Sequence, residues 1–221
     1  MANTNVAFGM RPIAKMSGAP MNHGVGTYTK YEIANGNTNK IYQGMPVIPL
    51  STGFIDRPGN ANGGIVPFVG VFYGCEYVSS VDGKLKFSNT WQGSGADSNF
   101  PIKAFVYDDP HQLFAITSDA TLTNEAGARA AVFANAPFGE AQSGSDVTGI
   151  SLARLAVGSI ATTQTLPLRI MGWQEDVENS DFTLGGVPLI VRFNNHFNAV
   201  GNFGGDGDAT SSGIGKINLG I

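Results

Sequence analysis

Serine, aspartate and histidine follow one another in the chain order that α/β-hydrolases use for a catalytic triad. Residues 149–153 read Gly-Ile-Ser-Leu-Ala, which is similar to a nucleophile elbow around Ser151, except that alanine replaces the last glycine. Asp176 or Asp181 and then His196 come later in the chain. The elbow requires a strand, a sharp turn and a helix inside a parallel sheet, and no such alternation surrounds Ser151. A small hydrolase is therefore the weakest functional hypothesis.

Asp108 and Asp109 are a second pair of groups with catalytic potential, because glycoside hydrolysis uses two carboxyl groups. They precede Pro110, and Asp-Asp-Pro is typical of a turn in which aspartate side chains cap backbone amides. We therefore expect a structural role for both residues, and the sequence predicts no catalytic site.

Metal and nucleotide motifs are incomplete. Residues 204–209 read Gly-Gly-Asp-Gly-Asp-Ala, a single imperfect copy of a calcium-binding repeat that works by stacking. Residues 215–217 read Gly-Lys-Ile and lack the Ser or Thr of a P-loop. The histidines do not have zinc-site spacing; they are His23, His111 and His196. No metal and no cofactor are predicted.

The single cysteine, Cys75, lies in the apolar segment 69–75. It cannot form an intramolecular disulfide, and no basic residue nearby in the sequence would stabilise a thiolate. We expect a buried, unreactive thiol.

The composition indicates a folded, loop-rich chain of low charge. Of 221 residues, 42% are hydrophobic and 14% are charged, against about 25% charged in a typical domain. Thirty glycines favour tight turns over helix interiors. The net charge is −4 and the 13 Lys and Arg residues are scattered, so direct nucleic-acid binding is not expected.

Apolar and polar residues alternate in short segments separated by turn residues, which predicts about nine strands. One helix is expected within residues 120–141, where Gly127 weakens an otherwise favourable segment. The clearest strand segments are 27–33, 40–50, 65–78, 84–87, 101–107, 112–117, 166–173 and 187–193. Segment 40–50 contains two prolines and should be an edge strand or bulged.

These patterns predict a mainly β fold, an antiparallel sandwich or barrel with long Gly/Asn-rich loops and at most one or two short helices. Residues 1–26 are expected to form an extended N-terminal arm, too broken by Gly and Pro for regular structure. Residues 27–200 would form the β domain and 201–221 a Gly-rich tail. No secretory signal and no apolar stretch of ~20 residues is present, so we expect synthesis and assembly in a cytoplasm, without a membrane.

Several segments together are similar to small head proteins of tailed bacteriophages. Residues 3–12 read Asn-Thr-Asn-Val-Ala-Phe-Gly-Met-Arg-Pro, and residues 18–20 supply the Gly-Ala-Pro that follows in that family. Residues 44–47 read Gly-Met-Pro-Val, where Met45 replaces the family's aspartate. Further similar segments are 70–77, 106–110 and 191–196, with Phe87 and Trp91 between the first two. The tail after Gly201 has no counterpart in the family.

The resemblance implies a head decoration, or cement, protein that binds the outside of an assembled capsid and stabilises it against internal DNA pressure. The implied partners are the major capsid protein and two further copies of the chain in a homotrimer. The implied location is the exterior of the virion, after synthesis in the host bacterium. We expect the arm to contact the partner through these residues: Asn3, Asn5, Phe8, Met10, Arg11, Ile13 and Met16.

Two other virion roles remain open. A tail or receptor-binding module would have the same loop-rich β character, and a copy number per particle would separate it from a cement protein. A major capsid protein is less consistent with the short length. For a cement protein, deletion of residues 1–16 is expected to abolish capsid binding and to leave the β domain folded.

Overall fold

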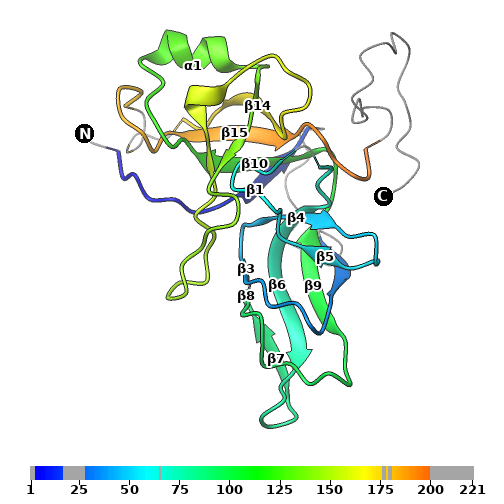
Figure 1. The fold of residues 1–221 in the computed structure, drawn as a ribbon. Helices are drawn as coiled ribbons and strands as arrows, with labels where there is room; N and C mark the ends of the chain where they lie inside the picture. The colour runs from blue at the N-terminus through cyan, green and yellow to red at the C-terminus, as the bar shows by residue number, and fades with distance from the viewer. Residues whose placement is uncertain (1–2, 17–27, 65, 176–177, 179–180, 200–221) are drawn as a thin grey trace, which may run out of the picture.

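The computed structural model describes residues 3–16, 28–64, 66–175, 178 and 181–199. Within them the chain is mainly β and its sheets are antiparallel, as the sequence predicts (Figure 1). Residues 1–2 and 17–26 of the expected arm, Asp176, and the expected tail 201–221 lie outside the described residues.

A five-stranded sheet occupies the upper part of Figure 1. Its order is β1-β10-β15-β14-β11, so the N-terminal strand forms one edge. The strands are β1 (Arg11–Lys15), β10 (Gln112–Thr117), β15 (Pro188–Phe193), β14 (Leu168–Trp173) and β11 (Asn135–Ala136). Beside this sheet β12 (Phe138–Gly139) pairs with β13 (Arg154–Leu155).

A six-stranded sheet forms the lower part (Figure 1). Five strands follow the order β2-β9-β6-β4-β5, and β7 also pairs with β6. They are β2 (Thr29–Ile33), β9 (Ile102–Tyr107), β6 (Gly70–Val78), β4 (Pro46–Pro49), β5 (Ile55–Asp56) and β7 (Leu85–Ser88). The short pair β3 (Ile41–Tyr42) and β8 (Thr90–Trp91) packs nearby.

Each sheet has its own apolar core. Phe68, Phe114 and Phe193 belong to the cluster of the five-stranded sheet, and Phe68 stacks on Phe193 with ring centroids 5.2 Å apart. Phe72 and Trp91 belong to the cluster of the six-stranded sheet. Segment 27–200 therefore contains two packed cores.

The period-two pattern of β9 decides which face of the six-stranded sheet is buried. Ile102, Ala104 and Val106 are fully buried in the core, whereas Lys103 and Phe105 are half-buried on the opposite face. Successive side chains of a strand point to opposite faces, so the alternation in the sequence becomes one covered face and one outer face. We call the face that carries Lys103 and Phe105 the outer face.

Gly70 and Gly74 are required because other backbone passes close to them. A Cβ at Gly70 would lie 2.0 Å from the carbonyl oxygen of Tyr107, and one at Gly74 would lie 2.8 Å from that of Ser88. The register of β6 against β9 also shifts between Phe72 and Gly74. Both glycines therefore lie where a neighbouring strand or loop comes too close for a side chain.

The expected helix is α1 (Glu125–Ala131). The side chain of Asn124 caps it by accepting a hydrogen bond from the Gly127 amide at 2.8 Å. A Cβ at Gly127 would lie 2.2 Å from the carbonyl oxygen of Leu122, so the residue that weakens the helix is the one that fits there. A 3₁₀ turn, η1 (Val157–Ser159), is the second short helical element.

Two local expectations are wrong. Residues 11–15 of the arm form strand β1, because β10 supplies backbone partners that the sequence of the arm does not reveal. Segment 40–50 divides into β3 and β4, and β4 lies between β6 and β5 and not at an edge. β4 tolerates prolines because, on the side of β6, the chain here accepts hydrogen bonds. The Phe72 amide donates to the Met45 carbonyl, and the Val69 amide donates to the Val47 carbonyl.

Candidate interaction surface

The first residues of the arm are held by two asparagines. The Asn3 side chain donates to the carbonyl oxygens of Asp181 (2.8 Å) and Gly185 (3.1 Å) and accepts from the Asp181 amide (3.0 Å). The Asn5 backbone carbonyl accepts from the Arg154 guanidinium at 3.1 Å, and its side-chain oxygen accepts from the same group. The expected partner-binding residues Asn3 and Asn5 therefore bind this chain itself.

Met10 anchors the arm in the core of the five-stranded sheet. Its side chain is 1% exposed, and its amide donates to the Gly44 carbonyl at 2.9 Å. Gly9 precedes it with a φ of 67°, a left-handed conformation that favours glycine, and a Cβ there would lie 2.8 Å from the Gly44 oxygen. In this conformation Met10 is not available to a partner.

The end of the arm continues as the edge strand β1. Lys15 forms an ion pair with Asp109 at 2.6 Å, and the Met16 amide donates to the His111 carbonyl at 3.0 Å. The sulfur of Met16 lies 3.4 Å from the Arg192 guanidinium, while the residue remains 45% exposed. Because β1 and Met10 complete the sheet and its core, deletion of residues 1–16 is now expected to destabilise the fold.

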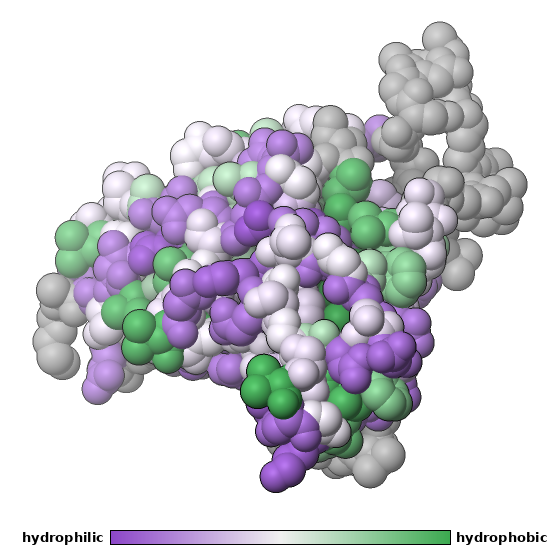
Figure 2. All heavy atoms as spheres, turned by 60° about the horizontal axis from the view of Figure 1, so that its bottom comes forward, coloured by the Kyte–Doolittle hydropathy of each residue, from purple (hydrophilic) through white to green (hydrophobic). Residues whose placement is uncertain are grey.

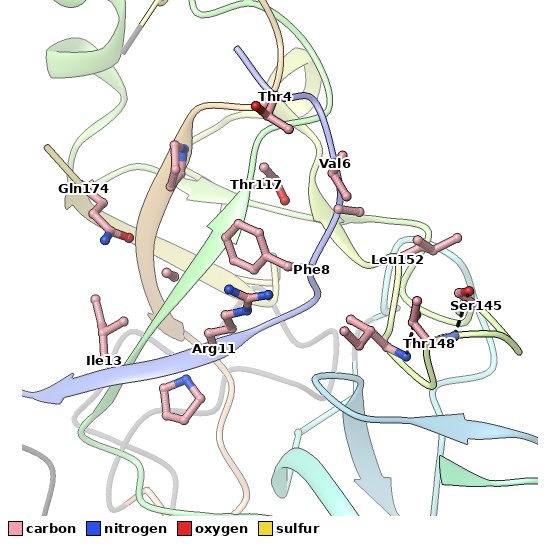
Figure 3. Close-up of a pocket in the computed structure, with 16 residues that line it drawn as sticks. Thr4, Val6, Phe8, Arg11, Ile13, Thr117, Ser145, Thr148, Leu152 and Gln174 are labelled. Carbon is pink, nitrogen blue, oxygen red and sulfur yellow. Dashed lines mark hydrogen bonds between the residues drawn. The ribbon is translucent and has the colours of Figure 1, made fainter. Parts of the chain in front are cut away.

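Alongside the arm runs a cavity of about 680 Å³, which we call the arm groove (Figure 3). Its lining is mostly apolar, and among the lining residues Arg11 alone is charged. The Arg11 guanidinium lies 4.5 Å from the centre of the Phe8 ring, and no ion pair within the described part of the chain involves it. Residues of the groove used below are Val6, Phe8, Arg11, Ile13, Ile150 and Leu152.

The arm groove meets a second cavity of about 280 Å³ at Phe8 and Arg11. Tyr73 and Tyr107 line the other side of this smaller cavity, and their rings meet edge to face at 5.4 Å. The groove therefore continues toward the outer face of the six-stranded sheet.

The outer face carries aromatic rings and balanced charges. Tyr28 and Tyr73 are 40% and 43% exposed, and the Tyr28 ring packs edge to face on Phe105 at 5.1 Å. Lys30 forms an ion pair with Glu76 at 2.9 Å and lies 5.2 Å from the centre of the Phe105 ring. Exposed aromatic side chains such as these are enriched at protein interfaces.

The hairpin of β6 and β7 extends the outer face at the lower end of the molecule (Figure 1). Three of its apolar side chains are exposed: Val81 by 88%, Leu85 by 57% and Phe87 by 68%. Figure 2 turns this end toward the viewer and shows hydrophobic patches separated by hydrophilic residues. The alternation in 84–87 indicated a strand, but it could not indicate that both faces of the hairpin stay exposed.

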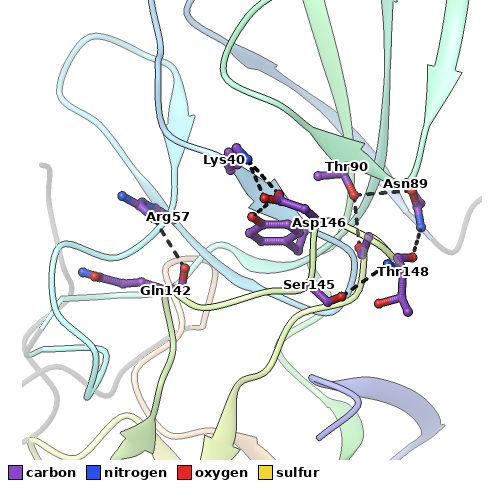
Figure 4. A network of polar contacts seen from close by, with 10 residues as sticks. Lys40, Arg57, Asn89, Thr90, Gln142, Ser145, Asp146 and Thr148 are labelled. Carbon is purple, nitrogen blue, oxygen red and sulfur yellow. Dashed lines mark hydrogen bonds and ion pairs between the residues drawn. The ribbon is translucent and has the colours of Figure 1, made fainter.

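A polar network fixes the loop that forms one wall of the arm groove (Figure 4). Both carboxylate oxygens of Asp146 accept from Lys40 at 2.8 Å, and Tyr42 donates to the same carboxylate at 2.8 Å. These hydrogen bonds, led by that from Lys40, hold the pKa of Asp146 below its usual value. Gln142 also receives a hydrogen bond from Arg57 on its carbonyl, at 3.4 Å.

The end of this loop is held by hydrogen bonds from two separate parts of the chain. The Asn89 side chain donates to the Thr148 carbonyl at 3.1 Å, and the Gln43 amide donates to the Gly149 carbonyl at 3.0 Å. Gly149 has a φ of 72°, and a Cβ on it would lie 2.5 Å from the Asn89 side chain. These contacts tie the groove wall to the rest of the chain, and no local sequence signal links residues 40–43 to 142–150.

The residues of the hydrolase hypothesis have structural partners. The Ser151 side chain is buried, donates to the Ser143 carbonyl at 3.3 Å and accepts from the Ala153 amide at 3.1 Å. His196, the histidine of that hypothesis, accepts a hydrogen bond at Nδ1 from the Asn198 amide at 3.1 Å. No hydrogen bond between Ser151 and His196 is present among the residues that the structure describes.

The two turn aspartates also have structural partners. Asp108 accepts a hydrogen bond from the Tyr31 hydroxyl at 2.8 Å. Asp109 accepts from the His111 amide at 2.8 Å, in addition to its ion pair with Lys15. The expectation that these carboxylates cap the turn is confirmed for Asp109.

Cys75 is 1% exposed, and its thiol lies 3.7 Å from the Thr90 carbonyl. Burial raises the pKa of the Cys75 thiol to about 12, so the thiol stays protonated at neutral pH. The expectation of a buried cysteine is confirmed.

Across the described ranges, no three His, Cys, Asp or Glu side chains are grouped as metal ligands. None of the helices in these ranges has the length and apolarity needed to cross a membrane.

Comparison with protein families, curated proteins and solved structures gives no match. The functional argument therefore rests on the arm, its groove, the outer face and the hairpin.

Proposed function

We propose that this chain is a structural protein of a tailed-phage particle, one that binds the outside of the assembled head and stabilises the shell. Its partners are the major capsid protein and further copies of itself, as a homotrimer, on the exterior of the virion. It needs no catalytic site, cofactor or nucleic acid for this role.

The observation that carries the proposal is the exposed apolar surface around the arm. Val6 is 62% exposed, and Phe8 and Ile13 line a groove of about 680 Å³ beside an edge strand. Large exposed apolar patches on soluble proteins mark surfaces that bind other proteins. An edge strand adds unpaired backbone groups that an extended segment of a partner can bind.

Rigidity also supports a role in stabilising a shell. The arm is held by side-chain hydrogen bonds at Asn3 and Asn5 and by the buried Met10, and the opposite groove wall is held by Asp146. A preorganised surface loses little conformational entropy when it binds. Many copies on one particle would then add their binding energies.

The test is co-sedimentation of the purified chain with mature heads that lack it. The arm variant Val6→Asp places a charge at the groove without removing any hydrogen bond of the described chain. We expect its affinity for heads to fall at least about tenfold, which corresponds to ~1.4 kcal/mol. Phe133→Asn is the matched control, because Phe133 is 74% exposed, has a φ of 72° that asparagine tolerates, and follows helix α1.

Equal binding of Val6→Asp, Phe133→Asn and the unaltered chain would contradict the role of the arm surface. A chain that ignores mature heads altogether would contradict the proposed function. Densitometry of virions separates the tail or receptor-binding alternative, since a head protein is present in hundreds of copies and a tail-tip module in few.

A further inference from the structure

The five-stranded sheet has a second face, opposite its core, that carries cations. On β15, Pro188, Ile190 and Arg192 alternate with residues of the core and therefore share this face. Pro188 also lines the arm groove, so the floor of the groove continues along the sheet as this face. We call it the arginine face, after Arg11, Arg169 and Arg192.

Two of the arginines lie side by side. Arg192 is the direct cross-strand partner of Arg169 on β14, and both side chains are half-buried. Like charges in opposite positions of a sheet destabilise it. Burial, and after it the charge of Arg169, lowers the pKa of Arg192. A function that uses both charges would account for an arrangement that costs stability.

These guanidinium groups have few acceptors in their own chain. Nε of Arg192 is buried without a hydrogen-bond partner among the described residues, and a terminal nitrogen of the same group donates to the Met16 sulfur at 3.4 Å. Arg169 donates from Nε to the Asn135 side chain at 3.0 Å. Neither arginine belongs to an ion pair of the described chain. Each guanidinium has five N–H donors, so most of them have no acceptor in this part of the chain.

Arg11 brings a third cation to the same face. It lies opposite Ala115 of β10, which in turn lies opposite Ile190 of β15. Arg192 follows Ile190 by two residues, so the Cα atoms of Arg11 and Arg192 are about 12 Å apart across two strand spacings. The half-buried Ile190 lies between the two cations.

A buried hydroxyl at the groove end of this face also lacks a partner. Thr117 and Arg11 both line the arm groove (Figure 3). Thr117 is 1% exposed, and its hydroxyl has no hydrogen-bond partner among the described residues. Buried hydroxyls in proteins are usually hydrogen-bonded, so this one is left for a ligand in the groove. The face thus combines an unused donor, an apolar strip and three unpaired cations.

We propose that the arginine face binds an extended acidic segment of the capsid protein, in which carboxylates flank an apolar residue. One carboxylate pairs with Arg11 and another with the neighbouring arginines of β14 and β15, while the apolar residue packs on Ile190. About four extended residues span the ~12 Å between the cations. Arginine is suited to this role because its planar fork binds a carboxylate through two hydrogen bonds.

The chemistry of the face favours a peptide over a nucleic acid. An apolar strip separates the cations, and the net charge of the chain is −4, which opposes binding to a phosphate backbone. That the segment belongs to the capsid protein rests on the proposed function, whereas its acidic character rests on the face itself.

The test uses the full chain and fluorescence anisotropy of a labelled probe peptide, Glu-Val-Glu-Val-Glu, with Gln-Val-Gln-Val-Gln as the uncharged counterpart. We expect the acidic peptide to bind at least about tenfold more tightly, and this difference to shrink as salt rises from about 0.05 to about 0.5 M. The double variant Arg169→Gln, Arg192→Gln should lose the difference. Arg11→Gln, which removes no hydrogen bond of the described chain, should reduce it independently. Arg129→Gln is the matched control, because Arg129 lies on helix α1 and pairs with Glu125.

The same variants link the face to the capsid. In co-sedimentation with mature heads, the double variant should bind at least about tenfold more weakly than the Arg129→Gln control, and the loss should diminish at high salt. The double variant should keep its melting temperature, because it removes two charges that repel each other.

The outcomes separate this inference from the proposed function. Equal binding of the two peptides, or selectivity that the arginine variants leave unchanged, overturns the acidic-segment site even if heads are bound. Selective peptide binding by a chain that ignores mature heads supports the acidic site and contradicts the capsid protein as its partner, and with it the proposed function.

Two other occupants would overturn the proposal. A single-stranded oligonucleotide that binds more tightly than the acidic peptide, through the same arginines, would assign the face to nucleic acid. Asp206→Asn with Asp208→Asn removes the aspartates of the segment 201–221. A tenfold rise in peptide affinity in that variant would show that the chain's own tail occupies the face.

Discussion

His196 should make the stability of this protein fall steeply in mild acid. The imidazole is 1% exposed and stacks edge to face on Phe193 at 5.9 Å. Its Nδ1 accepts from the Asn198 amide, so the proton of the neutral ring is on Nε2, which is buried without a partner among the described residues. Burial disfavours the charged form and lowers the pKa of His196 from 6.5 to about 4.

The size of the effect follows from the two pKa values. An unfolded chain protonates this histidine below pH 6.5, while the folded chain does so only below about pH 4. Between these values the unfolded state binds more protons, so the free energy of unfolding falls as the pH falls. The total loss is about 3 kcal/mol, and most of it is complete at pH 4.5.

Carboxylates contribute in a different window. The ion pair and hydrogen bonds of Asp109 outweigh its burial and hold its folded pKa below 3.8, so the stability it contributes is present above pH 3.8 and is lost below it. The contribution of His196 is therefore obtained by comparing the chain with a His196 variant between pH 7 and pH 4.5.

The assay is urea unfolding at several pH values over this range, followed by tryptophan fluorescence. In His196→Asn the side-chain amide oxygen can accept the hydrogen bond that the Asn198 amide donates to Nδ1. The variant has no titratable group at position 196. We expect the unaltered chain to lose about 2–3 kcal/mol more than this variant between pH 7 and pH 4.5. The control His111→Asn removes an exposed imidazole and should follow the unaltered chain. Parallel pH dependence in all three proteins would refute the reasoning.

Three further substitutions test the packing. Thr117→Val should raise stability by about 1 kcal/mol in thermal unfolding, because the buried Thr117 hydroxyl has no hydrogen-bond partner among the described residues; a loss of stability would show that it has one. Gly70→Ala should cost more than ~2 kcal/mol in urea unfolding, since its Cβ would lie 2.0 Å from the Tyr107 oxygen, while Gly158→Ala, with nothing within 4 Å, should be nearly neutral. Asn124→Ala removes the helix cap and should cost about 1 kcal/mol, and an unchanged melting temperature would argue against the cap.

Local sequence was sufficient for elements whose signals are local. The alternation in 101–107 and 112–117 predicts β9 and β10 almost to the residue, and Asp82-Gly83 predicts the turn before β7. The helix α1 follows from its good formers and its cap. In each case the physical signal, a side-chain period or a turn residue with the required backbone freedom, lies within about ten residues.

The role of the arm was not readable in the same way. Residues 11–15 contain Pro12, and Met10 precedes them after a glycine, a pattern that by itself indicates irregular structure. Pairing with β10, about 100 residues away in the chain, is what makes a strand of them, and the core of the five-stranded sheet is what buries Met10.

The sequence by itself determined a mainly β chain of low charge, because alternation, glycine content and scattered Lys and Arg are properties of the residues alone. Only the tertiary structure decided which apolar side chains remain uncovered. Leu85 and Phe87 alternate as buried residues would, yet no element of the described chain packs over them, whereas Met10 in a broken segment is fully buried. Burial depends on which distant segments come together. The arm groove also depends on such non-local contacts, because the loop that forms one of its walls is held by the ion pair between Asp146 and Lys40.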